Sequence, residues 1–107
     1  MLRRFIGLVL ALALPASLAH AQTASGSRLD DVIKSGKLRV CTPGDYKPFS
    51  FQRPDGGYEG LDIDLVQAAA KALGVEVEMV KTAWPALMKD FVEKCDAAVG
   101  GISVSTD

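Results

Sequence analysis

Three short apolar runs alternate with two helical patterns in this chain, and that alternation constrains its fold more than any other feature. The runs cover residues 37–42, 75–80 and 96–100, while the helical patterns cover residues 62–73 and 84–92. Strands that are connected by helices lie parallel to one another, because each connection must cross back over the sheet in a right-handed sense. The sequence therefore predicts an α/β fold with a parallel sheet and flanking helices.

The helix expected at residues 62–73 has the clearest pattern. Its apolar residues recur at intervals of three and four, which is typical of a helix with one buried face, and Gly74 follows as a stop. Asp62 suits the N-cap position, where its charge also favours the helix dipole. We interpret Asp62 as the cap and Asp64 as a solvated carboxylate, in preference to an acid–base pair. The apolar stripe comprises Ile63, Val66, Ala70 and Leu73, widened by Leu65 and Ala69.

Two smaller elements are expected on either side of the first strand. Ser27 and Gly36 suit the start and the end of a short helix. Residues 53–57, Arg-Pro-Asp-Gly-Gly, lie between short aromatic arms, which is typical of a hairpin turn. We expect the helix to pack on the lobe and the hairpin to project from the sheet as an antiparallel flap.

The loop at residues 44–49 follows the first strand and is the first candidate binding element. Loops at the carboxyl ends of parallel strands diverge and leave a crevice in open α/β sheets. A second loop, at residues 100–103, follows the third strand, and its serine and bare backbone N–H groups could face an anion. If the first strand lies between the other two, we expect a small-molecule site between Tyr46 and Ser103.

Each of these candidate residues also has a purely structural interpretation. Tyr46 could be a platform for a ligand or a residue that packs the loop, because it joins an apolar ring to a polar tip. Trp84 could line the same pocket or staple its helix onto the core. Ser103 could contact an anion, cap a helix or do both. We favour the ligand role for Tyr46 and leave Trp84 open between its two roles.

The first 21 residues are interpreted as a secretory signal peptide. Two arginines precede a ten-residue apolar run at 5–14, and the Ala-His-Ala tripeptide at 19–21 has the small residues of a cleavage site. The apolar run is shorter than the about 20 residues that span a bilayer. We therefore expect cleavage after Ala21, export to the periplasm, a flexible mature terminus at residues 22–27 and no membrane span.

Charge and composition narrow the functional classes. The mature chain would have 10 Lys and Arg against 13 Asp and Glu, a net charge of −3. No basic patch supports nucleic-acid binding. The sole histidine, His20, lies in the signal, so the mature chain offers no imidazole for a catalytic triad or a histidine metal site. We expect no nucleic-acid partner, no metal and no cofactor.

Cys41 and Cys95 are predicted to be two buried thiols and not a disulfide. Two cysteines in an exported chain would be consistent with a disulfide. Cys41, however, comes late in the first strand, and Cys95 comes just before the third. If these strands are parallel, an offset of about four residues places the two cysteines ~13 Å apart along the strand direction. That separation is too long for a disulfide.

Four segments together resemble the first lobe of the family 3 bacterial extracellular solute-binding proteins, which have the type II periplasmic binding fold. The resemblance runs from about Ser27 to the end of the chain. It implies that residues 28–107 form a partial N-terminal lobe of a two-lobe protein, truncated before its second lobe. The segments that carry it are residues 38–40, 44–49, 60–65 and 96–103.

A narrower resemblance, on residues 27–30, 44–50 and 84–91, points to the periplasmic cyclohexadienyl dehydratases. These are lyases on the same fold that convert prephenate or arogenate into phenylpyruvate or phenylalanine. The resemblance implies that the parent protein binds a small carboxylated metabolite. It would do so either as such a lyase or as a non-catalytic amino-acid receptor that serves an ABC permease.

The resemblance implies four ligand-binding residues in this lobe: Tyr46, Trp84, Gly101 and Ser103. Tyr46 and Trp84 would pack on the ligand, while the backbone of Gly101 and the hydroxyl of Ser103 would help to hold its carboxylate. The family places an arginine shortly after that serine and, in the dehydratase, a carboxylic general acid in the second lobe. No catalytic residue is therefore assigned within this chain, and we expect this lobe alone to be inactive.

Overall fold

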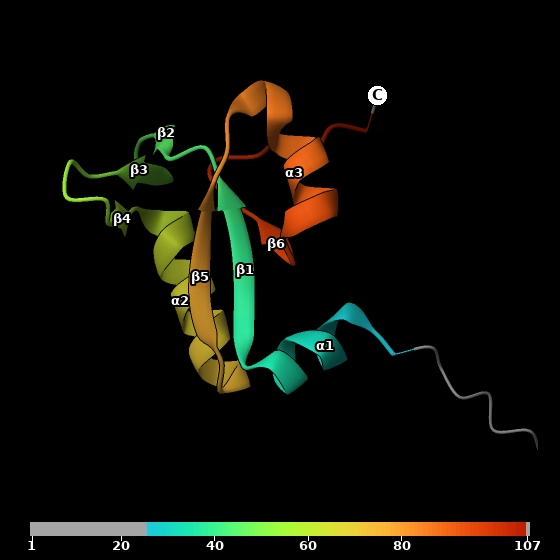
Figure 1. The fold of residues 1–107 in the computed structure, drawn as a ribbon. Helices are drawn as coiled ribbons and strands as arrows, with labels where there is room; N and C mark the ends of the chain where they lie inside the picture. Colours follow the sequence, from blue (N-terminus) through green and yellow to red (C-terminus); the bar gives the residue numbers. More distant parts are fainter. Residues whose placement is uncertain (1–25, 107) are drawn as a thin grey trace, which may run out of the picture.

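The computed structural model describes residues 26–106 (Figure 1). The expected signal peptide at residues 1–21 lies outside this part, as does most of the expected flexible terminus at residues 22–27. Among the described residues, no helix has the length and apolar character needed to cross a bilayer.

The main sheet has three parallel strands with the first one in the centre. Strand β1 (Lys37–Thr42) pairs with β5 (Glu76–Lys81) on one side and with β6 (Ala97–Ala98) on the other, so the order is β5-β1-β6. The second half of β1 is fully buried, as expected for a strand with neighbours on both sides. The predicted parallel α/β sheet is therefore confirmed, and its first strand is central, the condition on which the expected crevice depends.

Strand β5 lies at the edge of this sheet, and its residues alternate accordingly. Glu76 and Glu78 are exposed, whereas Val77 and Met79 are half-buried. This is the pattern that the sequence predicts for a half-buried edge strand, because successive side chains point to opposite faces.

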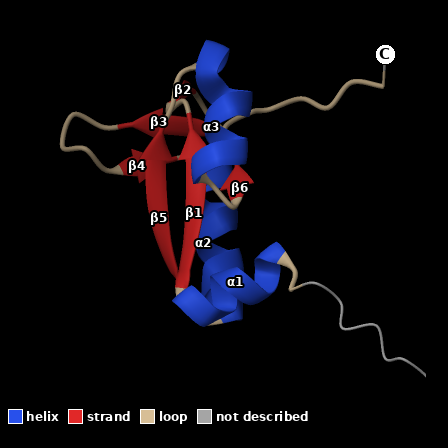
Figure 2. Cartoon of the chain, turned by 45° about the vertical axis from the view of Figure 1, so that its right-hand side comes forward, coloured by secondary structure: helices blue, strands red, loops and turns tan. Residues whose placement is uncertain are grey.

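Two helices cover opposite faces of the sheet. Helix α2 (Leu61–Leu73) lies behind the sheet in Figure 1, and α3 (Leu87–Lys94), preceded by the 3₁₀ turn η1 (Trp84–Ala86), lies in front; the turned view in Figure 2 agrees. Right-handed connections place the two helices on opposite faces, because the two crossings run in opposite directions. The chain crosses from β1 to β5 through α2, and it crosses back from β5 to β6 through α3. The three predicted layers are therefore present.

The short N-terminal helix α1 (Arg28–Ser35) has the predicted ends. Ser27 and Asp30 form a reciprocal capping box, and Gly36 closes the helix. Of the expected apolar face, Val32 is buried, while Leu29 and Ile33 remain half-exposed within the described part of the chain.

The predicted flap is a small antiparallel sheet. Strands β2 (Asp45–Tyr46), β3 (Ser50–Gln52) and β4 (Tyr58–Glu59) pair in the order β2-β3-β4. The turn between β3 and β4 is closed by the Arg53 N–H, which donates to the Gly57 carbonyl at 2.8 Å. The hairpin is confirmed, and β2, which the sequence did not indicate, pairs the Tyr46 loop with it.

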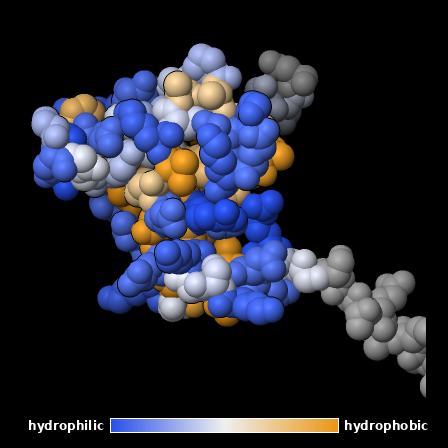
Figure 3. Space-filling view, viewed as in Figure 1, coloured by the Kyte–Doolittle hydropathy of each residue, from blue (hydrophilic) through white to orange (hydrophobic). Residues whose placement is uncertain are grey.

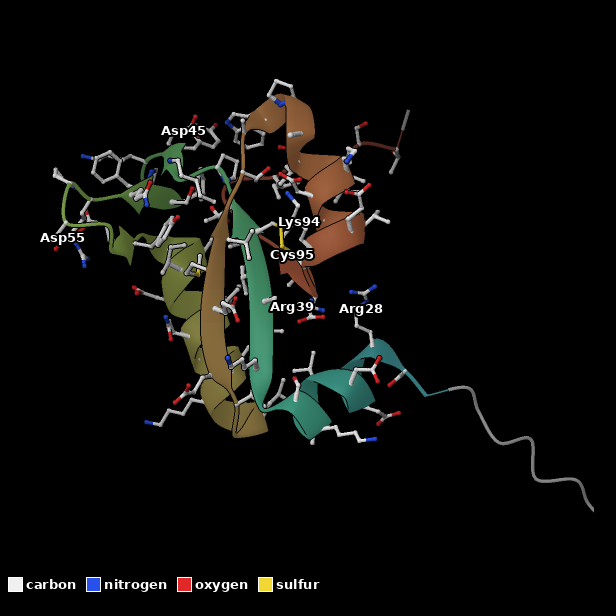
Figure 4. All side chains as sticks on the ribbon, viewed as in Figure 1. Arg28, Arg39, Asp45, Asp55, Lys94 and Cys95 are labelled. Atoms are coloured by element: carbon white, nitrogen blue, oxygen red, sulfur yellow. A yellow bond between two sulfur atoms is a disulfide. The ribbon has the colours of Figure 1, made fainter. Side chains whose placement is uncertain are left out.

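Cys41 and Cys95 form a disulfide, so the prediction of two free thiols is wrong. Their Cα atoms are 5.8 Å apart. Cys95 does not continue β6 along the sheet; it ends α3, and its N–H donates to the Phe91 carbonyl at 3.3 Å. Cys95 therefore reaches Cys41 from the end of the helix that packs over the strand. The distance between the two cysteines is not set by the register of β1 and β6, on which the prediction was based. The yellow bond beneath α3 in Figure 4 marks this disulfide, which packs with Leu87.

An ion cluster joins α1 to the start of β6. The Asp96 carboxylate accepts hydrogen bonds from the Arg39 N–H at 2.9 Å and from Arg39 Nη2 at 3.1 Å, and Arg28 Nη1 lies 3.5 Å away. The side chain of Asp96 is only 5% exposed. Figure 4 shows Arg28 and Arg39 side by side beneath Cys95. Burial alone would raise the pKa of Asp96, but the hydrogen bonds from Arg39 and the charges of both arginines outweigh it and lower that pKa.

The described chain leaves apolar side chains on its surface. Figure 3 shows apolar residues in the middle of the face that carries α3, between hydrophilic regions above and below. Met88 and Val92 of α3 and Leu61 and Leu65 of α2 are all more than three-fifths exposed. The buried core is correspondingly small and centres on β1.

Candidate functional site

The loops after β1 and β6 meet at the carboxyl edge of the sheet and flank an open cavity of about 270 Å³. This is where the sequence predicts a crevice, between the Tyr46 loop and the Ser103 loop. The change of chain direction at β1 opens the edge at this point. Six residues line the cavity: Tyr46, Phe49, Asp62, Gly101, Ile102 and Ser103.

Tyr46 forms the aromatic wall of this cavity. Its ring centroid lies 5.2 Å from that of Phe49 and 6.3 Å from that of Trp84, the latter at an interplanar angle of 76°. These are favourable edge and tilted arrangements for aromatic pairs. The Tyr46 side chain is nevertheless 47% exposed, so the ring both packs its loop and offers a free face.

Trp84 stands beside Tyr46 and does not itself line the cavity. Its indole Nε1–H donates to Asp45 Oδ1 at 2.9 Å, and the residue is 43% exposed. Asp45 lies at the upper edge of the flap in Figure 4. The indole therefore stands at the rim of the cavity and supports Tyr46, and it is not inserted into the core beneath α3.

The start of α3 is held in place by a hydrogen bond that links it to the end of β5. The hydroxyl of buried Thr82 donates to Asp90 Oδ2 at 2.6 Å. This hydrogen bond, followed by that from Lys94, lowers the pKa of Asp90. Because Trp84 lies in the turn between these residues, the link fixes the segment that carries the indole.

Gly100 and Gly101 form the opposite wall, and both of their N–H groups donate to Asp62. The distances to Asp62 Oδ2 are 3.0 Å from the Gly100 nitrogen and 2.8 Å from the Gly101 nitrogen. The Gly101 N–H, which the family resemblance offers for a ligand carboxylate, is thus already paired. Among the residues that line the cavity, a carboxylate would have to be held by the Ser103 side.

Asp62 is the residue of this site that sequence reasoning missed. It is not the N-cap of α2: that position is Gly60, which has no side-chain cap. The first N–H groups of the helix donate to the Tyr46 loop instead, from Leu61 to the Pro48 carbonyl at 2.9 Å and from Asp62 to the Phe49 carbonyl at 3.0 Å. Because the loop caps the helix, the Asp62 carboxylate is free to reach Gly100 and Gly101.

Ser103 lies in an exposed, irregular segment after β6. Its hydroxyl makes no hydrogen bond to another described side chain or backbone group. Ser103 lines the cavity.

The residues that line the cavity are acidic or neutral. Of the described residues that line it, none is a lysine or an arginine, and Asp62 is the one carboxylate. Lys47 points elsewhere: its Nζ sits 4.0 Å from the centre of the Phe51 ring, a cation–π contact. Within the described residues, no group of three or more potential metal ligands comes together.

A larger hollow of about 400 Å³ lies on the flap. It is as open to solvent as the Tyr46 cavity and shares none of the residues that line that cavity. Size alone would favour this hollow as the ligand-binding site. The convergence of loops, aromatic rings and polar groups favours the Tyr46 cavity as that site. The hollow is lined by Lys47, Pro48, Phe51, Glu59 and Gly60.

The fold is that of a lobe from a solute-binding protein. Residues 38–107 match the family described as bacterial extracellular solute-binding proteins, family 3. The chain belongs to this family.

Among curated proteins, the chain is 48% identical to the cyclohexadienyl dehydratase of Pseudomonas aeruginosa, over 98% of this chain and 40% of that protein. It is 33% identical to the L-cystine-binding protein TcyJ of Escherichia coli, over 92% of this chain and 38% of that protein. The chain thus spans about two-fifths of the length of these relatives.

Solved structures give the same two kinds of relative. A crystal structure of an ancestral cyclohexadienyl dehydratase is similar with a TM-score of 0.72 and 53% identity, over 77% of this chain and 34% of that one. The arginine-bound form of domain 1 from TmArgBP, of T. maritima, is similar with a TM-score of 0.67 and 29% identity, over 72% of this chain and 62% of that one.

Proposed function

We propose that this chain is the N-terminal ligand-binding lobe of a cyclohexadienyl dehydratase-like lyase, which acts on prephenate or arogenate. The observation that carries the proposal is the aromatic wall of Tyr46 and Phe49, backed by Trp84, which faces Gly101 and Ser103 across one cavity. A flat ring that bears a carboxylate matches both walls. The 48% identity to a cyclohexadienyl dehydratase adds support.

The chemistry divides between this lobe and the rest of the parent protein. As the bond from the ring to its carboxylate breaks, carbon dioxide leaves and the electron pair moves into the ring. The ring hydroxyl then departs as water, with a proton from a general acid. We assign to this lobe the positioning of the ring against Tyr46. The general acid belongs to the second lobe, and no catalytic residue is assigned here.

We propose the same four residues as ligand contacts, with the roles that the geometry supports. Tyr46 packs on the ring, and Trp84 supports Tyr46 at the rim. Gly101 offers a surface without a side chain. Ser103 offers its hydroxyl and backbone N–H to a carboxylate. We expect the two lobes of the parent to close on the bound ligand.

The second candidate is a non-catalytic amino-acid receptor that delivers its ligand to an ABC permease. Two findings favour it: the similarity to an L-cystine-binding protein and the similarity to an arginine-bound domain 1. Asp62 is also the one charged residue among the described residues that line the cavity, and a carboxylate there suits an ammonium group.

The two candidates are separated by turnover of the whole protein. The lyase proposal predicts that the purified parent converts prephenate into phenylpyruvate, followed by absorbance, and that Tyr46→Ala loses most of this activity. Lys47→Ala is the matched control, because the adjacent side chain contacts Phe51 and not the cavity. No turnover, together with quenching of Trp84 fluorescence by amino acids, would support the receptor instead.

We also propose that the protein is exported to the periplasm after cleavage behind Ala21. The signal-like composition of residues 1–21 and the match to an extracellular family support this. Sequencing the amino terminus of protein from a periplasmic extract tests it, and the expected first residue is Gln22. A protein that stays in the cytoplasm with residues 1–21 attached would contradict it.

A further inference from the structure

The first turn of α2 contacts both walls of the cavity. On the Tyr46 side, the Leu61 N–H donates to the Pro48 carbonyl at 2.9 Å and the Asp62 N–H donates to the Phe49 carbonyl at 3.0 Å. On the opposite side, the Asp62 carboxylate accepts from the Gly100 and Gly101 N–H groups. One residue, Asp62, thus takes part in both attachments.

The Gly100–Gly101 turn needs an acceptor of this kind. Both residues have positive φ, 130° and 75°, and their consecutive N–H groups converge on one carboxylate oxygen at 3.0 and 2.8 Å. Converging backbone N–H groups form a concavity that favours an anion. Here the chain supplies that anion itself, from 38 residues earlier in the sequence.

The position of this turn decides how close the two walls come. A Cβ atom on Gly101 would overlap the Tyr46 ring and lie 2.9 Å from Phe49 Cδ2. The ring and the Gly101 backbone are therefore in direct contact, and a small displacement of the turn changes the width of the cavity. Ser103 follows two residues later and moves with the turn.

We infer that Asp62 is a positioning residue: its carboxylate locks the Gly100–Gly101 turn against the Tyr46 loop and so sets the spacing of the ligand cavity. The choice of prephenate as the probe rests on the proposed function. The hydrogen bonds of Asp62 do not depend on that function. Loss of the carboxylate leaves two N–H donors unmatched beneath Tyr46, which is costly for partly buried groups.

The test uses the whole protein with two variants of Asp62 and a matched control. Asp62→Ala removes the acceptor, whereas Asp62→Asn keeps one acceptor oxygen without the charge. Asp64→Ala is the control, because Asp64 is an exposed carboxylate in the same first turn. Affinity for prephenate is measured by Trp84 fluorescence, with and without added formate. The amide resonances of Gly100 and Gly101 are followed by NMR in the absence of any ligand.

We expect Asp62→Ala to weaken prephenate binding by about 10- to 100-fold, because two hydrogen bonds to a charged group are lost. Asp62→Asn should fall between this variant and the wild type, and Asp64→Ala should stay within about twofold. Formate should restore several-fold of the lost affinity in Asp62→Ala alone, because a small carboxylate can occupy the place of the missing side chain. If Asp62 affected binding only through the overall stability of the fold, formate would not restore the affinity for prephenate.

The outcomes separate this inference from the proposed function. If the wild type does not bind prephenate, the proposed ligand is wrong, and the Gly100 and Gly101 resonances still decide the role of Asp62. They should shift upfield in Asp62→Ala and return with formate. If Asp62→Ala does not fold, Asp62→Asn provides the same readouts. Wild-type affinity in the variants, or unchanged Gly100 and Gly101 resonances, would overturn the inference.

Discussion

Cys41 and Cys95, 54 residues apart in sequence, are joined by a disulfide that fastens α3 to the central strand of the sheet. Both residues are fully buried. The bond encloses the flap, α2 and β5 within one covalent loop, which contains every described wall residue of the cavity except those after β6.

Reduction of this disulfide should therefore destabilise the lobe strongly. In the chain-entropy treatment, closing a loop of this length contributes about 4 kcal/mol to the free energy of unfolding. We expect the oxidised protein to unfold in urea at a clearly higher midpoint than the reduced protein. The double variant Cys41→Ala, Cys95→Ala serves as the control, since a reducing agent should leave its midpoint unchanged. Equal midpoints for oxidised and reduced wild type would contradict the prediction.

Asp96 should make stability depend on acid pH. Its pKa is lowered in the folded protein, because the hydrogen bonds from Arg39 and the charges of Arg39 and Arg28 outweigh the effect of burial. A lowered folded-state pKa stabilises the fold above the unfolded-state value, about 3.9, and this stabilisation is lost as pH falls through the folded-state value.

Asp96→Asn tests this linkage directly. The variant should be less stable than the wild type at pH 7 by about 1–3 kcal/mol, because donors of Arg39 lose a charged acceptor. The difference should shrink as the pH falls below about 4, where the wild-type carboxylate becomes protonated. Unfolding free energies measured from pH 7 to pH 2 give the comparison, with exposed Asp31→Asn as a charge-matched control. A constant difference across that range would rule out the role of Asp96.

Gly101→Ala should close the cavity through Tyr46. The added Cβ would meet the Tyr46 ring, and the left-handed φ of 75° adds a backbone cost. Gly56→Ala isolates the backbone cost, because Gly56 has a similar φ of 86° with nothing within 4 Å of the new Cβ. We expect Gly56→Ala to lose about 1–2 kcal/mol of stability and to keep ligand binding. Gly101→Ala should lose more stability and most of its binding; equal effects of the two substitutions would show that the contact with Tyr46 is unimportant.

Local sequence patterns predicted most of the framework correctly. The apolar run of β1 buries Val40 and Cys41, and the stripe of α2 buries Ile63, Val66 and Ala70, so the period of apolar residues predicts both element types. Leu65, Ala69 and Leu73, which the sequence also assigned to that stripe, are exposed. Gly36 and Gly74 end their helices as predicted. The Asp-Gly turn formed the hairpin. These features depend on neighbours within a few residues, which is the distance over which sequence patterns are informative.

The errors concern contacts between distant segments. Cys95 reaches Cys41 because a helix lies over the strand, and the spacing of cysteines in the sequence carries no information on that layer. Asp62 has the residue type and position of an N-cap, but the Tyr46 loop already satisfies the first N–H groups of the helix. Its carboxylate then pairs with Gly100 and Gly101. The cavity lies between the two loops that sequence reasoning indicated, Trp84 stands outside its lining, and the contact that connects the two loops was missed.

The central claim is that the ligand binds between Tyr46 and Ser103, and a map of amide resonances tests it most directly. Prephenate is added to the isotopically labelled whole protein, and shifts are assigned residue by residue. We predict the largest shifts at Tyr46, Gly101 and Ser103, with the Trp84 indole N–H also moved. Shifts confined to Lys47, Phe51 and Glu59, which line the larger hollow on the flap, would contradict the account.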